Sequence, residues 1–288
     1  NPNFYHCYYK IIFITMTNNT PKPQLRAFLK TNLLSKNKFI VILSVIVFNI
    51  SSSISQNTPQ GLGVQIGNSI IHSDYGEGNS SDVNALSVSL THSLYFFGIS
   101  SWRKQNTLND IALRSELNFV SNIKLSHKGK YVNGNGNLST QLRAMTGSFK
   151  ITNIGFQGEI YLKNLKEFIY YNNQYGTNLN PYLLAGIQFS IFKNSLNSTL
   201  GDWTQDSSVL PEKWRDPSDT SVGRGTSFSS TFGLGTRYKL NNEIDLNAQF
   251  KWQFFFSDNL DGLRSNSPGN EDNEWSTVVQ IGFIYNLF

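Results

Sequence analysis

The chain has 288 residues, and its composition favours strands over helices. Aromatic residues make up 14% of it and charged residues only 15%, compared with about 25% charged residues in ordinary soluble domains. Six of the 24 basic residues and none of the 19 acidic residues lie in residues 1–55, so the rest of the chain is close to neutral. With this balance we expect no nucleic-acid partner, because such a partner requires an extended basic surface.

The first 55 residues are interpreted as upstream sequence followed by a cleaved signal peptide. Residues 1–15 precede the first methionine, Met16, and are expected to be translated upstream sequence. Lys36 and Lys38 precede an apolar run at residues 39–50, which is shorter than the roughly 20 residues of a membrane-spanning helix. A short membrane anchor is the alternative interpretation. The small residues that follow predict export and cleavage before residue 56, at Ser53, Ser55 and Gln56.

Cysteine usage limits the chemistry of the exported part, residues 56–288. The only cysteine, Cys7, lies in the upstream stretch, so we expect no disulfide, no thiolate metal site and no cysteine nucleophile. No cofactor is expected either. An exported domain without disulfides needs another source of stability, and a sheet closed on itself within a membrane is one.

Eight segments alternate apolar residues with polar or small ones, which is the two-residue period of a strand. Most run for about ten residues or slightly more, as tilted strands that cross a bilayer do. Proline residues open or avoid these segments. The expected strands lie within residues 61–74, 83–97, 113–119, 151–162, 181–192, 227–240, 244–256 and 278–288.

The apolar faces of these segments are too bulky for the inside of a small barrel. In residues 244–256, for example, Phe250, Trp252 and Phe254 share one face, while Gln249 and Lys251 lie on the other. An eight-stranded barrel has room inside only for side chains. The pattern therefore predicts an all-β fold, an eight-stranded antiparallel transmembrane β-barrel with aromatic side chains in lipid and small polar ones inside. A soluble lipocalin-like barrel is the alternative.

The connections agree with a barrel whose amino terminus lies in the periplasm. The outward loops, at residues 74–82, 121–147, 193–226 and 257–275, are mostly long and polar. The inward turn at residues 241–243 is tight, whereas residues 163–180 are longer than the short-turn rule expects. We expect a helical turn in that segment and consider it a periplasmic contact site.

The end of the sequence fits the assembly signal of bacterial outer-membrane barrels. That signal is a polar residue, a glycine, an aromatic residue and a hydrophobic residue at fixed spacing, followed here by a terminal aromatic residue. A last strand with this pattern is expected to pair with the open edge of the barrel-assembly machinery, as in strand addition. The positions are Gln280, Gly282, Tyr285, Leu287 and Phe288.

Three stretches carry a resemblance to a known family: "GDWTQDSSVLPEKW", "FGLGTRYKLNNEIDLNAQFKWQFFFSDNLDGL" and "NEW". With them, most of residues 60–288 resembles a flavobacterial family of small outer-membrane β-barrels from Bacteroidota. The chain is more distantly similar to the PorG-type barrel linked to type IX secretion and to OmpA/OmpX-like barrels. The resemblance implies an outer-membrane barrel in a Gram-negative cell and carries over no catalytic residues.

Seven charged residues of the strands are expected to face the lumen. Opposite charges should pair there, because an unpaired buried charge is costly. A salt-bridge network that fills the lumen is the favoured interpretation, and the selectivity lining of a small pore is the alternative. The residues are Arg114, Glu116, Glu159, Arg237, Lys239, Asp245 and Lys251.

The candidates for catalysis and for metal binding are weak. His92 and His127 each adjoin a serine, but neither pair has a carboxylate at a spacing that would complete a hydrolase triad. We therefore expect no enzyme, with an outer-membrane hydrolase kept as an alternative. The acidic residues of the loop at 257–275 lack the spacing of a calcium loop, so we expect a solvated loop there.

Trp203 and Trp214 lie among polar residues of the long loop at 193–226. Exposed tryptophans often anchor protein interfaces, so they are candidates for a loop interface. The alternative is that they pack the loop over the barrel mouth.

Together these features predict an outer-membrane barrel with a structural or interaction role, as an accessory to a secretion or envelope complex. Its expected partners are outer-membrane lipid, the barrel-assembly machinery and a protein of that complex. The alternatives are a small pore for solutes and an envelope hydrolase.

Overall fold

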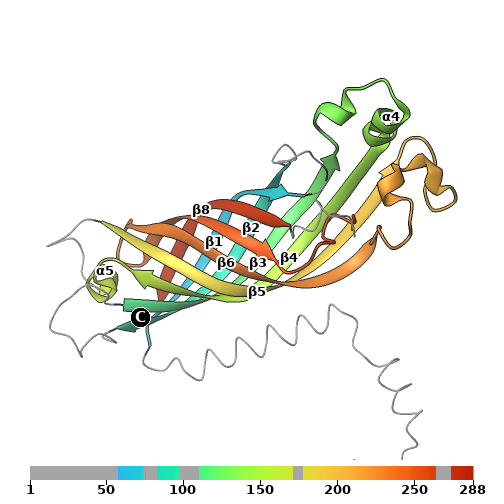
Figure 1. The fold of residues 1–288 in the computed structure, drawn as a ribbon. Helices are drawn as coiled ribbons and strands as arrows, with labels where there is room; N and C mark the ends of the chain where they lie inside the picture. The colour runs from blue at the N-terminus through green and yellow to red at the C-terminus, as the bar shows by residue number, and fades with distance from the viewer. Residues whose placement is uncertain are drawn as a thin grey trace, which may run out of the picture. The chain divides into compact units, whose positions relative to one another are not determined.

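The computed structural model describes residues 58–73, 75, 83–97, 110–170, 178–263 and 274–287 (Figure 1). The chain divides into two compact units, Asn1–Gln56 and Asn57–Phe288, and every described residue belongs to the second. The expected signal peptide, its apolar run and its cleavage residues Ser53, Ser55 and Gln56 lie outside the described residues, as does Phe288.

The second unit is a closed barrel in which each strand pairs antiparallel with the next and β8 pairs with β1. The prediction of an eight-stranded antiparallel barrel is therefore confirmed. The strands are β1 (Gln60–His72), β2 (Val83–Phe97), β3 (Asp110–Ser126), β4 (Met145–Tyr161), β5 (Leu179–Ser198), β6 (Gly223–Lys239), β7 (Ile244–Phe255) and β8 (Trp275–Leu287).

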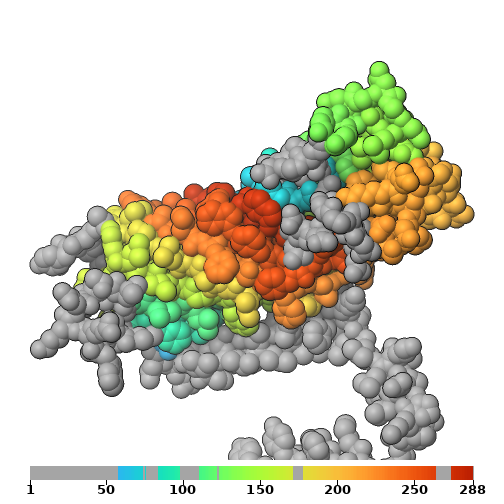
Figure 2. Space-filling model, viewed as in Figure 1, coloured from blue at the N-terminus to red at the C-terminus, as the bar shows by residue number. Residues whose placement is uncertain are grey.

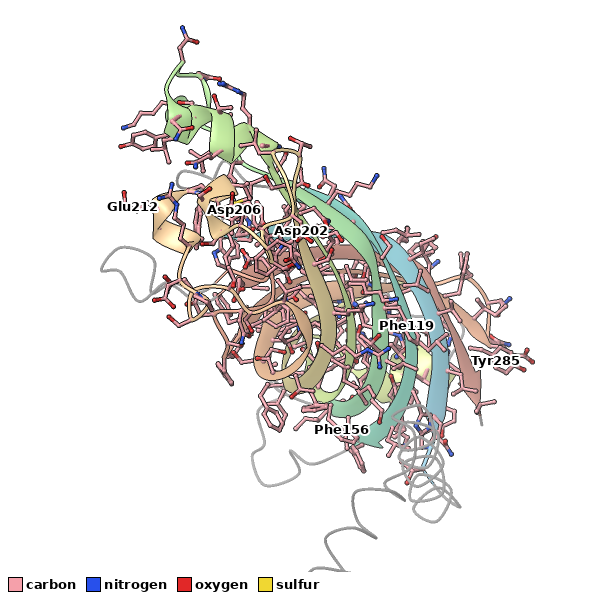
Figure 3. All side chains as sticks on the ribbon, turned by 90° about the vertical axis from the view of Figure 1, so that its right-hand side faces the viewer. Phe119, Phe156, Asp202, Asp206, Glu212 and Tyr285 are labelled. Atoms are coloured by element: carbon pink, nitrogen blue, oxygen red, sulfur yellow. The ribbon has the colours of Figure 1, made fainter. Side chains whose placement is uncertain are left out.

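The two faces of the strands have the orientation that the alternation predicts. Ile187 on β5 is 65% exposed, whereas its neighbour Gln188 is 2% exposed. Phe119, Phe156 and Tyr285 point away from the barrel wall (Figure 3). The strands are therefore apolar on the outside and polar on the inside, which is the reverse of the arrangement in a soluble barrel. Such an outer surface is suited to contact with hydrocarbon.

Strands β3 to β6 are longer than their sequence patterns indicate, and they extend the wall at one end of the barrel (Figure 1). The extension includes a register shift in β3 between Val120 and Ile123. The sequence pattern of outward apolar residues ends earlier, because the outward residues of the extension are polar. The backbone ladder continues because its hydrogen bonds do not depend on which side chains point outward.

Short helices lie at both ends of the barrel. At the end with the extended strands are η3 (Lys130–Val132), α4 (Asn137–Ala144), η4 (Ser207–Val209) and η5 (Glu212–Trp214). At the other end lie α5 (Leu165–Tyr170), where a helical turn was expected, and the tight connection between β6 and β7. Within the described part of the chain, no helix has the length and apolar character to cross a membrane.

The interior has three layers, which corrects the expectation of a small, polar lumen with all aromatic side chains outside. A buried apolar cluster lies under the long loops, a polar layer lies in the middle, and a second cluster with Tyr95, Tyr161 and Tyr182 lies next to α5. Glycine makes room for these rings: a Cβ atom on Gly235 would lie 2.3 Å from the ring of Tyr182. Aromatic rings therefore fit inside an eight-stranded barrel where glycines face them.

Candidate functional site: a sealed lumen beneath a covered mouth

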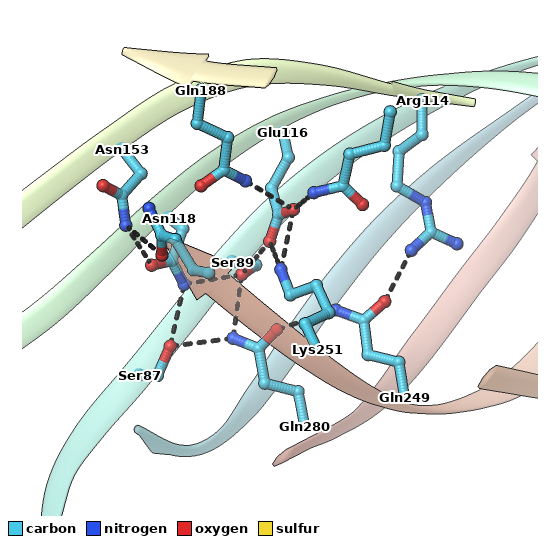
Figure 4. A network of polar contacts seen from close by, with 12 residues as sticks. Ser87, Ser89, Arg114, Glu116, Asn118, Asn153, Gln188, Gln249, Lys251 and Gln280 are labelled. Atoms are coloured by element: carbon cyan, nitrogen blue, oxygen red, sulfur yellow. Dashed lines mark hydrogen bonds and ion pairs between the residues drawn. The ribbon is translucent and has the colours of Figure 1, made fainter. Parts of the chain in front are cut away.

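The polar layer is organised around Glu116 of β3, which is 2% exposed (Figure 4). Lys251 Nζ lies 2.6 Å from Glu116 Oε1 and 2.8 Å from Oε2. Ser89 Oγ donates to Oε1 at 2.7 Å, and the amides of Gln157 and Gln188 donate to Oε2. Lys251 is on β7, four strands away from β3 in either direction around the eight-stranded barrel. The Lys251–Glu116 ion pair therefore crosses the lumen from one wall to the opposite wall.

A second ion pair lies closer to the α5 end. Arg114 Nη2 is 2.5 Å from Glu159 Oε1, and both side chains are fully buried. Arg114 also donates from Nη1 to Gln249 Oε1 at 2.7 Å, which joins β3 to β7, and its guanidinium lies over the ring of Tyr182. The planar guanidinium can hold a carboxylate, an amide and an aromatic face at once, which a lysine at this position could not do.

The third ion pair joins neighbouring strands at the α5 end. Arg237 Nη2 lies 2.5 Å from Asp245 Oδ2 and also donates to Asn286 Oδ1 at 2.8 Å. Asn286 returns a hydrogen bond from Nδ2 to Asp245 Oδ2 at 2.9 Å. Lys239 takes a different role from the other six charged residues of the lumen set, because its Nζ donates to the carbonyl oxygens of Phe168 and Ile169 at 2.8 and 2.6 Å. It thus holds the carboxyl end of α5 against the barrel opening.

The amide and hydroxyl side chains that complete the polar layer lie inside the barrel, where the alternation predicts small polar residues, although the sequence singles out none of them as a site residue. Asn118 Nδ2 donates to the hydroxyls of Ser87 and Ser89, and Asn153 Nδ2 donates to Asn118 Oδ1 (Figure 4). Ser190 Oγ in turn donates to Asn153 Oδ1 at 2.7 Å. Their signal in the sequence is position alone: each lies on the face of its strand opposite the outward apolar residues. Buried amides stabilise a core when they are hydrogen-bonded, and these bonds link β2, β3, β4 and β5 within the layer.

Two positions of the expected assembly signal have structural roles in the closed barrel. Gln280 Nε2 donates to the hydroxyls of Ser87 and Ser89 at 2.9 and 2.8 Å. A Cβ atom on Gly282 would lie 2.0 Å from the carbonyl oxygen of Val64, across the seam between β8 and β1. Tyr285 and Leu287 point outward and are 45% and 37% exposed. Barrel packing therefore explains the polar residue and the glycine independently of recognition by an assembly machine.

The mouth of the barrel is covered by two ordered loops, residues 127–144 and 199–222, whose surfaces meet at one end of the barrel (Figure 2). Gln141 Nε2 of the first loop donates to the carbonyl oxygen of Ser208 in the second at 2.7 Å. The second loop contains three tight turns in which an aspartate accepts the backbone N–H two residues later. These are Asp202 to Thr204, Asp206 to Ser208 and Asp216 to Ser218, two of which are labelled in Figure 3.

The two tryptophans of the second loop face the barrel, which favours the packing alternative over the interface one. Trp214 is 6% exposed, and its ring stacks on His127 with centroids 5.2 Å apart. Tyr75 stacks on His127 at 4.7 Å. Trp203 Nε1 donates to the carbonyl oxygen of Leu196 at 2.9 Å and packs against the apolar cluster under the loops. Burial, with a smaller contribution from the charge of Lys213, lowers the pKa of His127 to about 4.

Glu274, next to β8, holds part of the acidic loop by hydrogen bonds to its backbone. Glu274 Oε1 accepts the backbone N–H groups of Leu260 and Asp261 at 2.7 and 3.3 Å. Burial, and then the neighbouring Asp261, raise the pKa of Glu274 well above its ordinary value. Among the residues that the structure describes, no group of three His, Cys, Asp or Glu side chains is placed to hold a metal ion.

The three histidines of the barrel unit make contacts that have structural explanations. His127 is part of the Tyr75–His127–Trp214 stack. His72 stacks on Trp275 with ring centroids 3.6 Å apart. His92 Nε2 shares a hydrogen bond with Gln60 Oε1 at 2.8 Å. Of the three, only His127 belongs to the packing of the covered mouth, whereas His72 and His92 lie on the outward face of their strands.

Comparison with known proteins gives fold-level similarity only. No protein-family model matches the sequence, and no curated protein matches it. Solved structures with a similar fold include Ail, the attachment invasion locus protein of Yersinia pestis, at 9% identity and a TM-score of 0.37, covering 80% of this chain and 99% of Ail. A major outer-membrane protein of Thermus thermophilus has 9% identity and a TM-score of 0.42, covering 81% and 100% of the two chains. OprG of Pseudomonas aeruginosa has 12% identity and a TM-score of 0.35, covering 80% and 94%.

Proposed function

We propose that this protein is an outer-membrane barrel with a sealed lumen, and that it acts through its surfaces as a structural or interaction component of an envelope or secretion complex. The location is supported by the outward faces of the strands. They carry large exposed apolar side chains, such as Val64, Phe228 and Phe283 at 56%, 61% and 57% exposure. A belt of this kind around a polar interior is stable in lipid and would aggregate in water.

The observation that carries the sealed lumen is the Lys251–Glu116 ion pair. Its two residues come from opposite walls, and neither is more than 3% exposed. Ions could pass only if this pair and the amides around it separated. Separation would leave two unpaired charges buried away from water, which costs several kcal/mol. An interaction role is thus favoured over a role as a pore.

The covered mouth offers a surface for a partner. Tyr131 and Leu138 on the first loop and Leu200 and Val222 on the second are between 44% and 55% exposed. Apolar side chains on ordered loops are typical of contact sites. The resemblance of the sequence to small barrels of Bacteroidota, and more distantly to the PorG-type barrel of type IX secretion, supports a partner within such a complex.

Two measurements test the proposal. The purified protein in planar lipid bilayers is expected to give no steady conductance, and regular channel steps would overturn the sealed lumen. For the interaction role, a photo-reactive amino acid is introduced at Leu138 or Leu200 and crosslinked in native membranes. We expect a discrete protein adduct from both positions. A matched probe at Ile187, which is 65% exposed on the lipid-facing belt, should give none; equal labelling at all three positions would contradict the proposal.

A further inference from the structure

The charged residues of the strands are distributed unevenly over the two faces of the wall. All four acidic residues of the strands are buried, namely Asp110, Glu116, Glu159 and Asp245. The strands carry eight basic residues, of which four lie in the lumen and four are exposed on the outer face. The outward four are Lys124, Lys150, Lys193 and Arg224. All four lie on the extended part of β3 to β6, at the end that carries the covered mouth.

Three of these residues form a continuous row across the wall. Lys150 on β4 is the direct cross-strand partner of Lys193 on β5, and Lys193 is the direct partner of Arg224 on β6. Because adjacent strands are about 4.8 Å apart, three positive charges originate within about 10 Å of one another. Lys124 on β3 pairs with Ser148 of β4, one outward position beyond Lys150. We call these four side chains the basic row.

The row is unfavourable without a counter-ion. Like charges directly opposite each other destabilise a sheet. The ion pairs between described residues join lumen side chains, and none of them includes a member of the basic row. The strand positions therefore bring cations together on a face where the sheet supplies no carboxylate.

The position of the row relative to the apolar belt indicates what neutralises it. On β5 the outward residues are apolar from Leu183 to Ile191, and Lys193 is the next outward residue. Ile191 pairs with Thr152 and Thr226 on either side, so hydroxyl groups border the row on its belt side. Ser148 and Ser195, which share a hydrogen bond at 2.8 Å, border it on the loop side. A cation row with flanking hydroxyls, one step beyond the hydrocarbon belt, lies at the depth of lipid headgroups.

We propose that the basic row is a binding site for the phosphate groups of an anionic lipid in the leaflet next to the covered mouth. This inference rests on the proposed membrane location and not on the sealed lumen or on the partner at the mouth. Short turns are periplasmic and long loops extracellular in outer-membrane barrels, so the row lies in the outer leaflet. The ligand is a phosphorylated glycolipid headgroup, whose phosphates accept hydrogen bonds from lysine, arginine and the flanking hydroxyls.

The test measures binding of diphosphorylated lipid A to the folded protein in dodecyl maltoside micelles by native mass spectrometry. The row variant is Lys150→Gln/Lys193→Gln/Arg224→Gln. The control variant, Lys128→Gln/Lys130→Gln/Lys166→Gln, removes the same charge from exposed sites outside the row. We expect the row variant to bind lipid A at least about tenfold more weakly, since each of the three surface cations contributes severalfold to attraction by anionic lipid, and the control to bind as the unaltered protein does.

Further arms of the experiment separate the sources of phosphate. We expect lipid A without its two phosphates to bind the unaltered protein weakly. Its affinity should match that of diphosphorylated lipid A for the row variant. Inorganic phosphate at millimolar concentration should not displace the phosphorylated lipid. Equal binding by the row variant and the unaltered protein, equal binding of the dephosphorylated lipid, or displacement by inorganic phosphate would overturn the proposal. Heat-dependent mobility on gels shows that each variant is folded, and none of these outcomes depends on conductance or on crosslinking at the mouth.

Discussion

Lys251 and Glu116 face each other across the lumen from opposite walls of the barrel, with Lys251 Nζ 2.6 and 2.8 Å from the two carboxylate oxygens of Glu116. No backbone hydrogen bond joins β7 to β3. The pair is therefore a crosslink that the sheet itself does not provide, and its removal has consequences for both stability and permeability.

The variant Lys251→Met is expected to lower the free energy of unfolding by about 3–5 kcal/mol, because it leaves Glu116 as an uncompensated buried charge. Urea unfolding in lipid vesicles, followed by tryptophan fluorescence, measures the change. The double variant Lys251→Met/Glu116→Gln should recover most of the loss, since the remaining amide is neutral. Lys166→Met on the exposed face of α5 is the control and should change stability by less than about 0.5 kcal/mol. Equal unfolding midpoints for Lys251→Met and the control would refute a stabilising crosslink.

The double variant Glu116→Ala/Lys251→Ala is expected to make the barrel conduct. The two side chains of this crosslink are then truncated, and water can enter the polar layer between the amides. Planar-bilayer recording should show discrete steps for this variant and none for the unaltered protein. Lys128→Ala/Lys166→Ala serves as the matched control and should stay closed. A variant that remains as closed as the control would mean that other residues seal the lumen.

Gly282→Ala is expected to impair closure of the barrel at the β8–β1 seam. A Cβ atom there would lie 2.0 Å from the carbonyl oxygen of Val64 and 2.5 Å from the Cα atom of Gln65, so the backbone itself would have to move. We expect a destabilisation of more than about 3 kcal/mol and a large loss of folded protein on heat-modifiability gels. Gly158→Ala on β4 is the control, because the nearest atom to its Cβ would be 3.8 Å away. Similar folded yields for the two variants would contradict the steric argument.

Packing of the covered mouth is expected to loosen as the pH falls from about 6.5 to about 4. The pKa of His127 is lowered from 6.5 to about 4 in the folded protein. Between these values, His127 takes up a proton only when the loop detaches and exposes its ring to water, so acid favours the detached form. Above pH 6.5 the histidine is neutral in both forms and its packing is fully stabilising; below about 4 no further loss occurs. Hydrogen exchange of residues 199–222 should therefore accelerate relative to that of β7.

His127→Phe is the control for this pH dependence, because it keeps a ring between Tyr75 and Trp214 but cannot be protonated. Glu274 acts in the opposite direction: its pKa is raised in the folded protein, so its contribution is present below pH 4.5 and is lost as the pH rises through the raised value. If acid increases hydrogen exchange of residues 199–222 equally in His127→Phe and in the unaltered protein, then protonation of His127 is not the cause.

The alternation in the sequence predicts the strands and their faces well, because each depends on a local period. Ile187 and Gln188, adjacent in the chain, are 65% and 2% exposed as the pattern indicates. The predicted strands end where the alternation of apolar residues ends. The sequence predicts a loop beyond Phe192, because Lys193 and Asn197 are polar. The structure continues β5 there because its backbone pairs with β4 and β6.

The sequence also predicts which side chains face the lumen, but it does not predict which of them contact each other. Position in each strand places Glu116, Lys239 and Lys251 inside the barrel. Only the register of eight strands around a closed circle brings Lys251 across to Glu116 and leaves Lys239 to bind the carbonyl oxygens of α5. The basic row has the same origin: Lys150, Lys193 and Arg224 are separated along the chain, and the pairing of β4, β5 and β6 aligns them. A two-residue period determines the face on which a side chain lies, because it is a property of a single strand, whereas its neighbours depend on strand register, which is set by the whole closed sheet.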